Sequence, residues 1–198
     1  MVLNPPVTIM AGGSFAKQGV KTLSLAGINS LNGDFELQQG VVSLQSAAAI
    51  GGTGKIVFTG GVLQYSSLNN TDVSGRIDLA RSTAIKIDTG NASLVTFAGI
   101  GSPTATGAAS LTKSGTTVLS ITGPSYYSGG TVLSAGDLAV SHGQALGTGA
   151  LTLSAGRLVF QGASALNLQV GGNLTVNSGS MLMMRLADQS SVIPAADS

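Results

Sequence analysis

The 198-residue chain contains no cysteine and a single histidine, His142. Without thiols it can form neither disulfides nor thiolate metal sites, and cysteine catalysis is excluded. One histidine also argues against most zinc sites and against a Ser-His-Asp triad. We therefore expect no catalytic residue, no cofactor and no metal site in this chain.

Charge is scarce as well. Charged residues make up 9% of the chain, and 9 basic and 8 acidic residues leave a net charge of +1, so we expect no nucleic-acid partner and no anionic membrane partner. Hydrophobic residues nevertheless make up 43%. This combination excludes ordinary disorder, whose signature is low hydrophobicity with high charge.

Long apolar segments are missing too. The apolar runs at residues 47–50 and 181–184 are far shorter than a membrane span, so we expect no direct membrane insertion by this segment. Residues 1–11 lack the basic start and apolar run of a signal peptide, and an export signal is expected outside the chain. Residues 193–198 add no closing element, which predicts a truncated end.

The chain is rich in small residues. It contains 29 glycines, and glycine, serine and threonine together account for more than a third of its residues. Glycine follows no period of three, which excludes a collagen triple helix.

An internal repeat organises these glycines. Residues 14–45 match residues 110–141 without gaps, with nine identities in 32 positions that include Lys17/Lys113. After a one-residue slip the match continues to the end of each copy. The predicted divisions are an N-terminal end or cap (1–13), a first, degenerate copy (14–66), spacer coils (67–109), a second copy (110–162) and C-terminal coils (163–198).

Short alternating segments lie between the glycines. In residues 117–121 the alternation places Leu119 and Ile121 on one face, and no segment shows a helical stripe, so the chain is predicted to be all-β. Gly19, Gly40 and Gly61 follow one another at 21-residue intervals. Three short strands per interval predict a three-sided parallel β-solenoid with about nine coils of about 21 residues.

The glycine register makes a further prediction. Asp137 and Arg157 each follow a coil-marking glycine, so they are expected to stack one above the other. Val41 and Val62 hold the matching sites of the first copy and are expected to stack in the same way.

Five segments of the second copy form one continuous motif. They are Leu111-Thr-Lys-Ser-Gly115, Leu119-Ser-Ile-Thr-Gly123, Tyr126-Tyr-Ser-Gly-Gly-Thr131, Ala135-Gly-Asp-Leu138 and Ala145-Leu-Gly-Thr-Gly-Ala-Leu151. The motif closely resembles the autotransporter-associated β-strand repeat, also called the passenger-associated transport repeat. The first copy is degenerate, since Phe15-Ala-Lys17 replaces the opening and residues 30–34 replace the Tyr-Gly-Gly-Thr corner.

The resemblance covers most of residues 14–160. It implies a right-handed parallel β-helix within a bacterial autotransporter-type passenger, exposed at the cell surface or outer membrane, or secreted. The family's translocator barrel is not in this chain, and its repeat carries no catalytic residues, so no enzyme activity is expected. The expected role is a structural stalk that aids vectorial folding during export and displays a distal functional part.

Two alternatives use surface residues. An adhesin-like module would bind a surface glycan or a host or neighbour-cell protein through Tyr126 and outward hydroxyls (Thr116, Thr122, Thr131, Thr152), whereas Tyr127 is expected to pack inward. A polysaccharide-cleaving β-helix enzyme would use Asp34 and Glu36 as acid and base. Further charged candidates are Arg76, Asp78, Lys86 and Asp88.

The ends of the chain suggest one more partner. If both terminal coils expose unpaired strand edges, the fragment is expected to associate end to end with further copies of itself.

Overall fold

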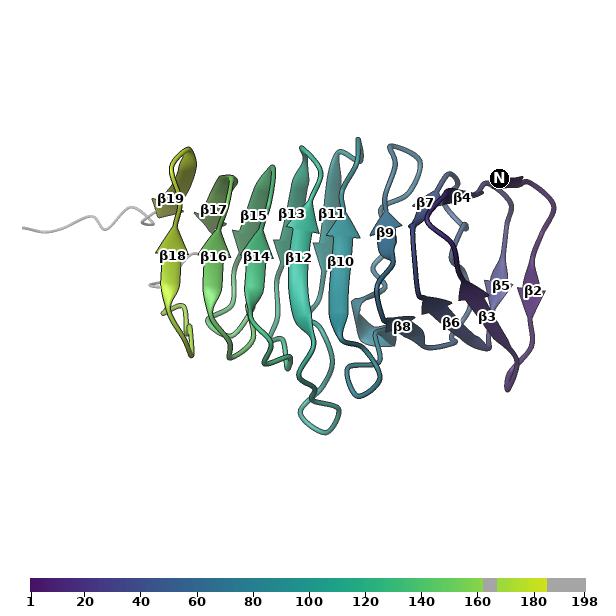
Figure 1. Ribbon diagram of the computed structural model, residues 1–198, viewed down its shortest axis with the longest axis horizontal. Coiled ribbons are helices and arrows are strands. Elements are labelled where there is room, and N and C mark those ends of the chain that lie inside the picture. Colours follow the sequence, from purple (N-terminus) through teal and green to yellow (C-terminus); the bar gives the residue numbers. More distant parts are fainter. Residues whose placement is uncertain (162–166, 185–198) are drawn as a thin grey trace, which may run out of the picture.

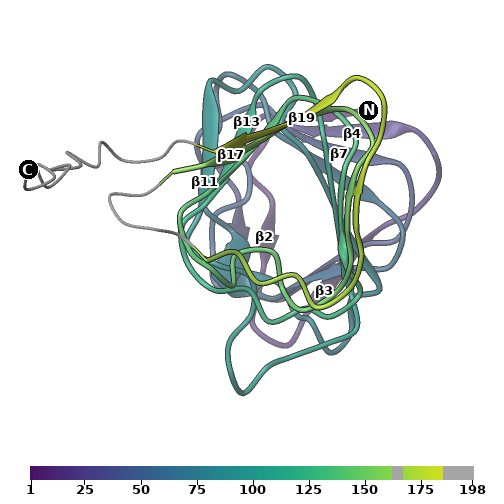
Figure 2. The ribbon, with the colours of Figure 1, turned by 90° about the vertical axis from the view of Figure 1, so that its left-hand side faces the viewer.

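The computed structural model describes residues 1–161 and 167–184. These residues form 19 short strands and one turn of 3-10 helix, η1 (Ser74–Arg76), and none of their helical structure is long and apolar enough to cross a membrane. The strands stack in parallel coils as a β-solenoid of about eight turns (Figure 1). Viewed from the C-terminal end, the chain winds anticlockwise while it approaches the viewer, so the solenoid is right-handed (Figure 2). The predicted all-β solenoid is confirmed.

One sheet extends along the whole solenoid. Sheet A has nine strands: β1 (Val2–Leu3), β4 (Thr22–Leu25), β7 (Val41–Leu44), β9 (Val62–Gln64), β10 (Ala84–Asp88), β12 (Ser110–Ser114), β14 (Thr131–Leu133), β16 (Leu151–Leu153) and β18 (Leu174–Val176). Each coil contributes one strand to it.

The other sheets are shorter. Sheet B contains β2 (Thr8–Ile9) and β5 (Ser30–Leu31), and sheet C contains β3 (Ser14–Lys17), β6 (Asp34–Leu37) and β8 (Ile56–Phe58). Sheet D contains β11 (Leu94–Phe97), β13 (Val118–Ile121), β15 (Asp137–Val140), β17 (Gly156–Phe160) and β19 (Ser180–Met184). Part of the predicted C-terminal segment, residues 163–166 and 185–198, lies outside the described residues.

Coil length varies around the predicted value. Leu23 pairs with Val42, 19 residues later, in the first copy. The linking region has longer coils, because Leu63 pairs with Ile87 after 24 residues and Ile87 pairs with Lys113 after 26. These longer coils use up residues, so the described chain completes about eight turns, where about nine were expected for all 198 residues.

The two copies of the repeat occupy different sides of the solenoid. In the first copy, β3 lies in sheet C and the next strand, β4, lies in sheet A. The equivalent strands of the second copy, β12 and β13, lie in sheets A and D. The motif has therefore advanced by one side, which Figure 2 shows as the different positions of β3 and of β11 and β13 around the axis. The linking strand β10 makes the shift, since it pairs with β9 on one edge and β12 on the other.

Alternating side chains fill the interior. In β6, Phe35 and Leu37 are fully buried, whereas Asp34 and Glu36 between them are only partly buried. Fully burying a side chain such as leucine contributes roughly 2 kcal/mol. Phe15 of the preceding coil stacks on Phe35 with ring centroids 5.4 Å apart. The core is thus built from rows of apolar residues that repeat from coil to coil.

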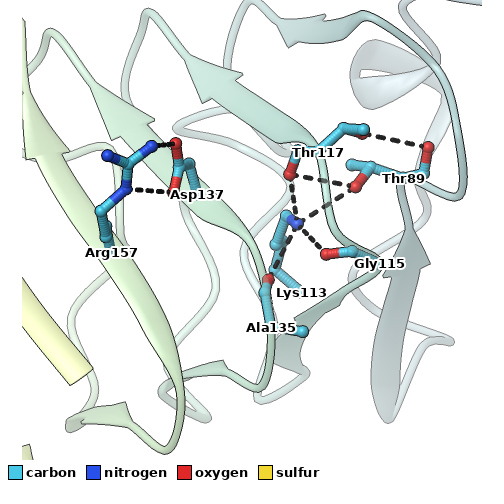
Figure 3. Close-up of polar contacts among 7 residues, drawn as sticks. All are labelled: Thr89, Lys113, Gly115, Thr117, Ala135, Asp137 and Arg157. Carbon is cyan, nitrogen blue, oxygen red and sulfur yellow. Dashed lines mark hydrogen bonds and ion pairs between the residues drawn. The ribbon is translucent and has the colours of Figure 1, made fainter. Parts of the chain in front are cut away.

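The predicted register is confirmed at two sites. Asp137 of β15 pairs with Arg157 of β17, and Arg157 Nε donates a hydrogen bond of 2.8 Å to Asp137 Oδ1 (Figure 3). Val41 of β7 pairs with Val62 of β9. The coil-marking glycines therefore report the true stacking of the strands.

Candidate functional site

A buried lysine closes the corner at the start of the second copy. Lys113 lies on β12 and has no exposed surface. Its Nζ donates hydrogen bonds to the carbonyl oxygens of Gly115 (2.7 Å), Thr117 (2.6 Å) and Ala135 (2.9 Å), and to Thr89 Oγ1 (3.1 Å; Figure 3). The ammonium group thus satisfies carbonyl groups that the turn withdraws from the sheet ladder.

The first copy contains the same arrangement. Lys17 Nζ donates to the carbonyl oxygens of Gln18 (2.8 Å), Gly19 and Gln39 (3.0 Å). The Gly19 and Gln39 carbonyls are the counterparts of those of Gly115 and Ala135, which bind Lys113, at the 96-residue offset of the repeat. The repeat therefore carries a lysine-capped glycine corner, and the cap moves with the motif from the sheet C/A corner to the sheet A/D corner.

This corner was not predicted from the sequence, although a signal for it was present. Lys113 stands two residues after Leu111 in an alternating strand, so both side chains point to the same face. Leu111 is fully buried, and Lys113 is buried beside it. A lysine at an inward position, repeated in both copies of a chain with few charges, indicates a buried and paired ammonium group.

Burial changes the acidity of this lysine. Loss of hydration lowers the pKa of the Lys113 ammonium to about 8, although the negative charges of Asp137 and Asp88 act in the opposite direction. The ordinary value is 10.5.

This shift predicts a pH dependence of stability. Between about pH 8 and 10.5 the unfolded chain holds a proton that folded Lys113 has released, so the free energy of unfolding rises with pH in this window. The expected gain is on the order of 1 kcal/mol. Urea unfolding near both limits of the window measures it, and the same comparison in Lys113→Met is the control. An equal rise in that variant would assign the effect to other groups.

The structure separates the two predicted surface carboxylates. Asp34 and Glu36 both lie on β6, but Asp34 Oδ2 accepts a hydrogen bond of 2.7 Å from Arg81 Nη1, and Glu36 Oε2 accepts one of 2.9 Å from Gln38 Nε2. Each carboxylate thus has a different partner within the chain.

Arg81 brings a different acid to Asp34. Its Nε lies 2.8 Å from Asp78 Oδ2, so one guanidinium group bridges Asp34 and Asp78. Partial burial alone would raise the pKa of Asp78, but hydrogen bonds from Arg81 hold it below its ordinary value. A general acid needs a raised pKa, so the environment of Asp78 favours an ion-pair role.

The remaining charged candidates bind groups of the chain itself. Arg76 Nη1 donates to Ile50 O (2.6 Å) and its Nε to Gly54 O (2.7 Å), Lys86 Nζ donates to Gly60 O (3.1 Å), and Asp88 Oδ1 accepts from the Gly90 N–H (2.8 Å). Within the described ranges no group of three or more histidine or acidic residues could hold a metal ion.

The neighbouring tyrosines face different environments. Tyr127 is fully buried, as expected, and its hydroxyl lies 2.6 Å from Thr131 Oγ1. Thr131 was predicted to point outward, and this was wrong. It is 1% exposed because the Tyr127 hydroxyl and the Leu146 carbonyl draw its side chain into the core. Tyr126 is only partly buried and packs against the edge of the core.

These features define the class of protein to which the chain belongs, a repeat-built, right-handed β-solenoid with buried lysine-capped corners. The family model of the passenger-associated-transport-repeat matches residues 15–44 and 111–140. The chain thus contains two passenger-associated transport repeats, and the solenoid is a β-helix of the autotransporter passenger type, a class of surface-exposed or secreted proteins. No curated protein and no solved structure matches the chain.

Proposed function

We propose that this solenoid is a stalk segment that holds a distal functional part of the passenger away from the membrane. The observation that carries the proposal is the pairing pattern. In all four sheets, strands pair with those of adjacent coils, at separations of 19 to 26 residues in sheet A. Coils that depend only on their neighbours form a rod of extendable length.

The same pattern supports a role in export. Contacts that are local in sequence let folding proceed coil by coil as the chain emerges from a pore. Lys113 joins three successive coils, because it binds Thr89 in the coil before, Gly115 in its own coil and Ala135 in the coil after. The second copy thus provides a strong local contact from which stacking extends.

The charged groups fit a structural role better than polysaccharide cleavage. Asp34 and Asp78 are held by Arg81, and Arg76 binds main-chain carbonyls of lower coils. Groups engaged in this way stabilise the stack and have little freedom to transfer protons to a substrate.

Surface display tests the stalk and folding roles. The 198-residue chain is placed between an N-terminal epitope and a translocator barrel, and epitope exposure on intact cells is measured. We expect Lys113→Met to reduce display several-fold, because the emerging coils lose the contact that fixes their stack. Lys55→Met is the control, since Lys55 is exposed. Equal display of both variants, with the isolated Lys113→Met chain unfolded, would contradict a role of coil folding in export.

A further inference from the structure

A groove opens on the outer surface beside Tyr126. Its volume is about 430 Å³. The polar and aromatic residues that line it are Thr106, Ser125, Tyr126, Ser128, Gln144 and Thr148. No charged side chain is among its lining residues, which distinguishes it from the surface around Arg81.

The groove is shaped by the longest coil of the linking region. That coil includes a loop at residues 101–107, which projects beyond the neighbouring coils in Figure 2. Main-chain hydrogen bonds hold its floor, with the Tyr126 N–H donating to Ile100 O (2.8 Å) and the Ser125 N–H donating to Gln144 O (2.9 Å). The walls are therefore set before any ligand arrives, which lowers the entropic cost of binding.

Tyr126 differs from the other two tyrosines of the chain. Tyr65 and Tyr127 are buried, and their hydroxyls are hydrogen-bonded to Thr71 O (2.9 Å) and Thr131 Oγ1 (2.6 Å). Tyr126 instead lines this groove and a second one of about 460 Å³ near Asp72. Its ring is thus the aromatic surface shared by two adjoining grooves.

We propose that this groove binds a neutral oligosaccharide. A sugar offers an apolar C–H face, which suits an aromatic ring, and hydroxyl groups, which suit uncharged amides and hydroxyls such as those of Gln144 and Thr148. An anionic glycan would find no cationic partner among the lining residues. The position of Tyr126 between two grooves fits a chain of several sugar units. This activity is additional to the stalk role and does not depend on it.

Saturation-transfer NMR on the full chain tests the proposal. The probes are neutral gluco-, manno- and galacto-oligosaccharides and their sulfated or uronic-acid counterparts. We expect at least one neutral probe to bind, Tyr126→Ala to weaken its Kd at least about tenfold, and Tyr126→Phe to leave the Kd within about threefold, since the ring face remains. Gln144→Ala removes an exposed amide with no buried contact to lose, and is also expected to weaken binding.

A remote glutamine serves as the matched control. Gln39→Ala also removes an exposed amide, far from the groove, and is expected to leave binding unchanged. Three results would overturn the proposal: no neutral probe binds, acidic probes bind more tightly than neutral ones, or Tyr126→Ala and Gln144→Ala both bind as the wild type does.

Discussion

Replacing Lys113 by methionine is expected to lower the free energy of unfolding by about 3–5 kcal/mol. Methionine keeps the apolar stem but leaves the carbonyl groups of Gly115, Thr117 and Ala135 without their shared donor. Each buried acceptor left unpaired costs about 1–3 kcal/mol. Against a typical domain stability of about 5–15 kcal/mol this loss is large. Urea unfolding followed by far-UV circular dichroism measures it.

Two further lysines calibrate this effect. Lys55→Met changes an exposed side chain and is expected to alter stability by less than about 0.5 kcal/mol. Lys17→Met removes the equivalent cap near the N-terminal end, where Lys17 keeps 8% exposure and water can replace part of the lost bonding. Its cost should lie between the other two. A Lys113→Met loss no larger than that of Lys55→Met would show that the carbonyls find other partners.

Removing the proton from Lys113 is a different perturbation from removing the side chain. A neutral amine still carries two N–H donors, so the corner stays capped while the cost of burying a charge disappears. This is why stability is expected to rise with pH above about 8, whereas the methionine variant is expected to be unstable at any pH.

The sequence was sufficient to predict the solenoid and its local register. Period-two alternation predicted the buried face of β6, and the glycine spacing predicted the Asp137–Arg157 pair. These features depend on residues within one or two coils, so they are visible in a single repeat. The coil length of about 21 residues is an average that the sequence also gave.

The relation between the two copies was not predictable in this way. Sequence alignment places β3 opposite β12, yet they lie in sheets C and A. The shift arises in the linking region, where the 24- and 26-residue coils carry no copy of the motif that would reveal their phase. The groove beside Tyr126 was missed for the same reason, because the loop at residues 101–107 belongs to the longest of these coils.

Glycine at the second corner of the second copy is expected to be almost irreplaceable. Gly136 has a φ of +68°, and a Cβ at this position would collide with the carbonyl oxygen of Gly115 and lie 2.7 Å from both Lys113 Nζ and Thr117 O. The left-handed conformation alone costs an L-residue about 1–2 kcal/mol. The collision adds to it, because the obstacles are main chain and a fixed ammonium group. We expect Gly136→Ala to lose about 4 kcal/mol or more in urea unfolding.

Gly19→Ala separates the two contributions. Gly19 has nearly the same conformation, with a φ of +72°, but no atom lies within 4 Å of the added Cβ. Its loss should therefore equal the conformational cost alone, about 1–2 kcal/mol. The difference between the two variants measures how tightly one coil rests on the next at the lysine-capped corner. Equal losses would mean that the coils yield to an added methyl group, and a stack that yields so readily would be poorly suited to act as a rigid stalk.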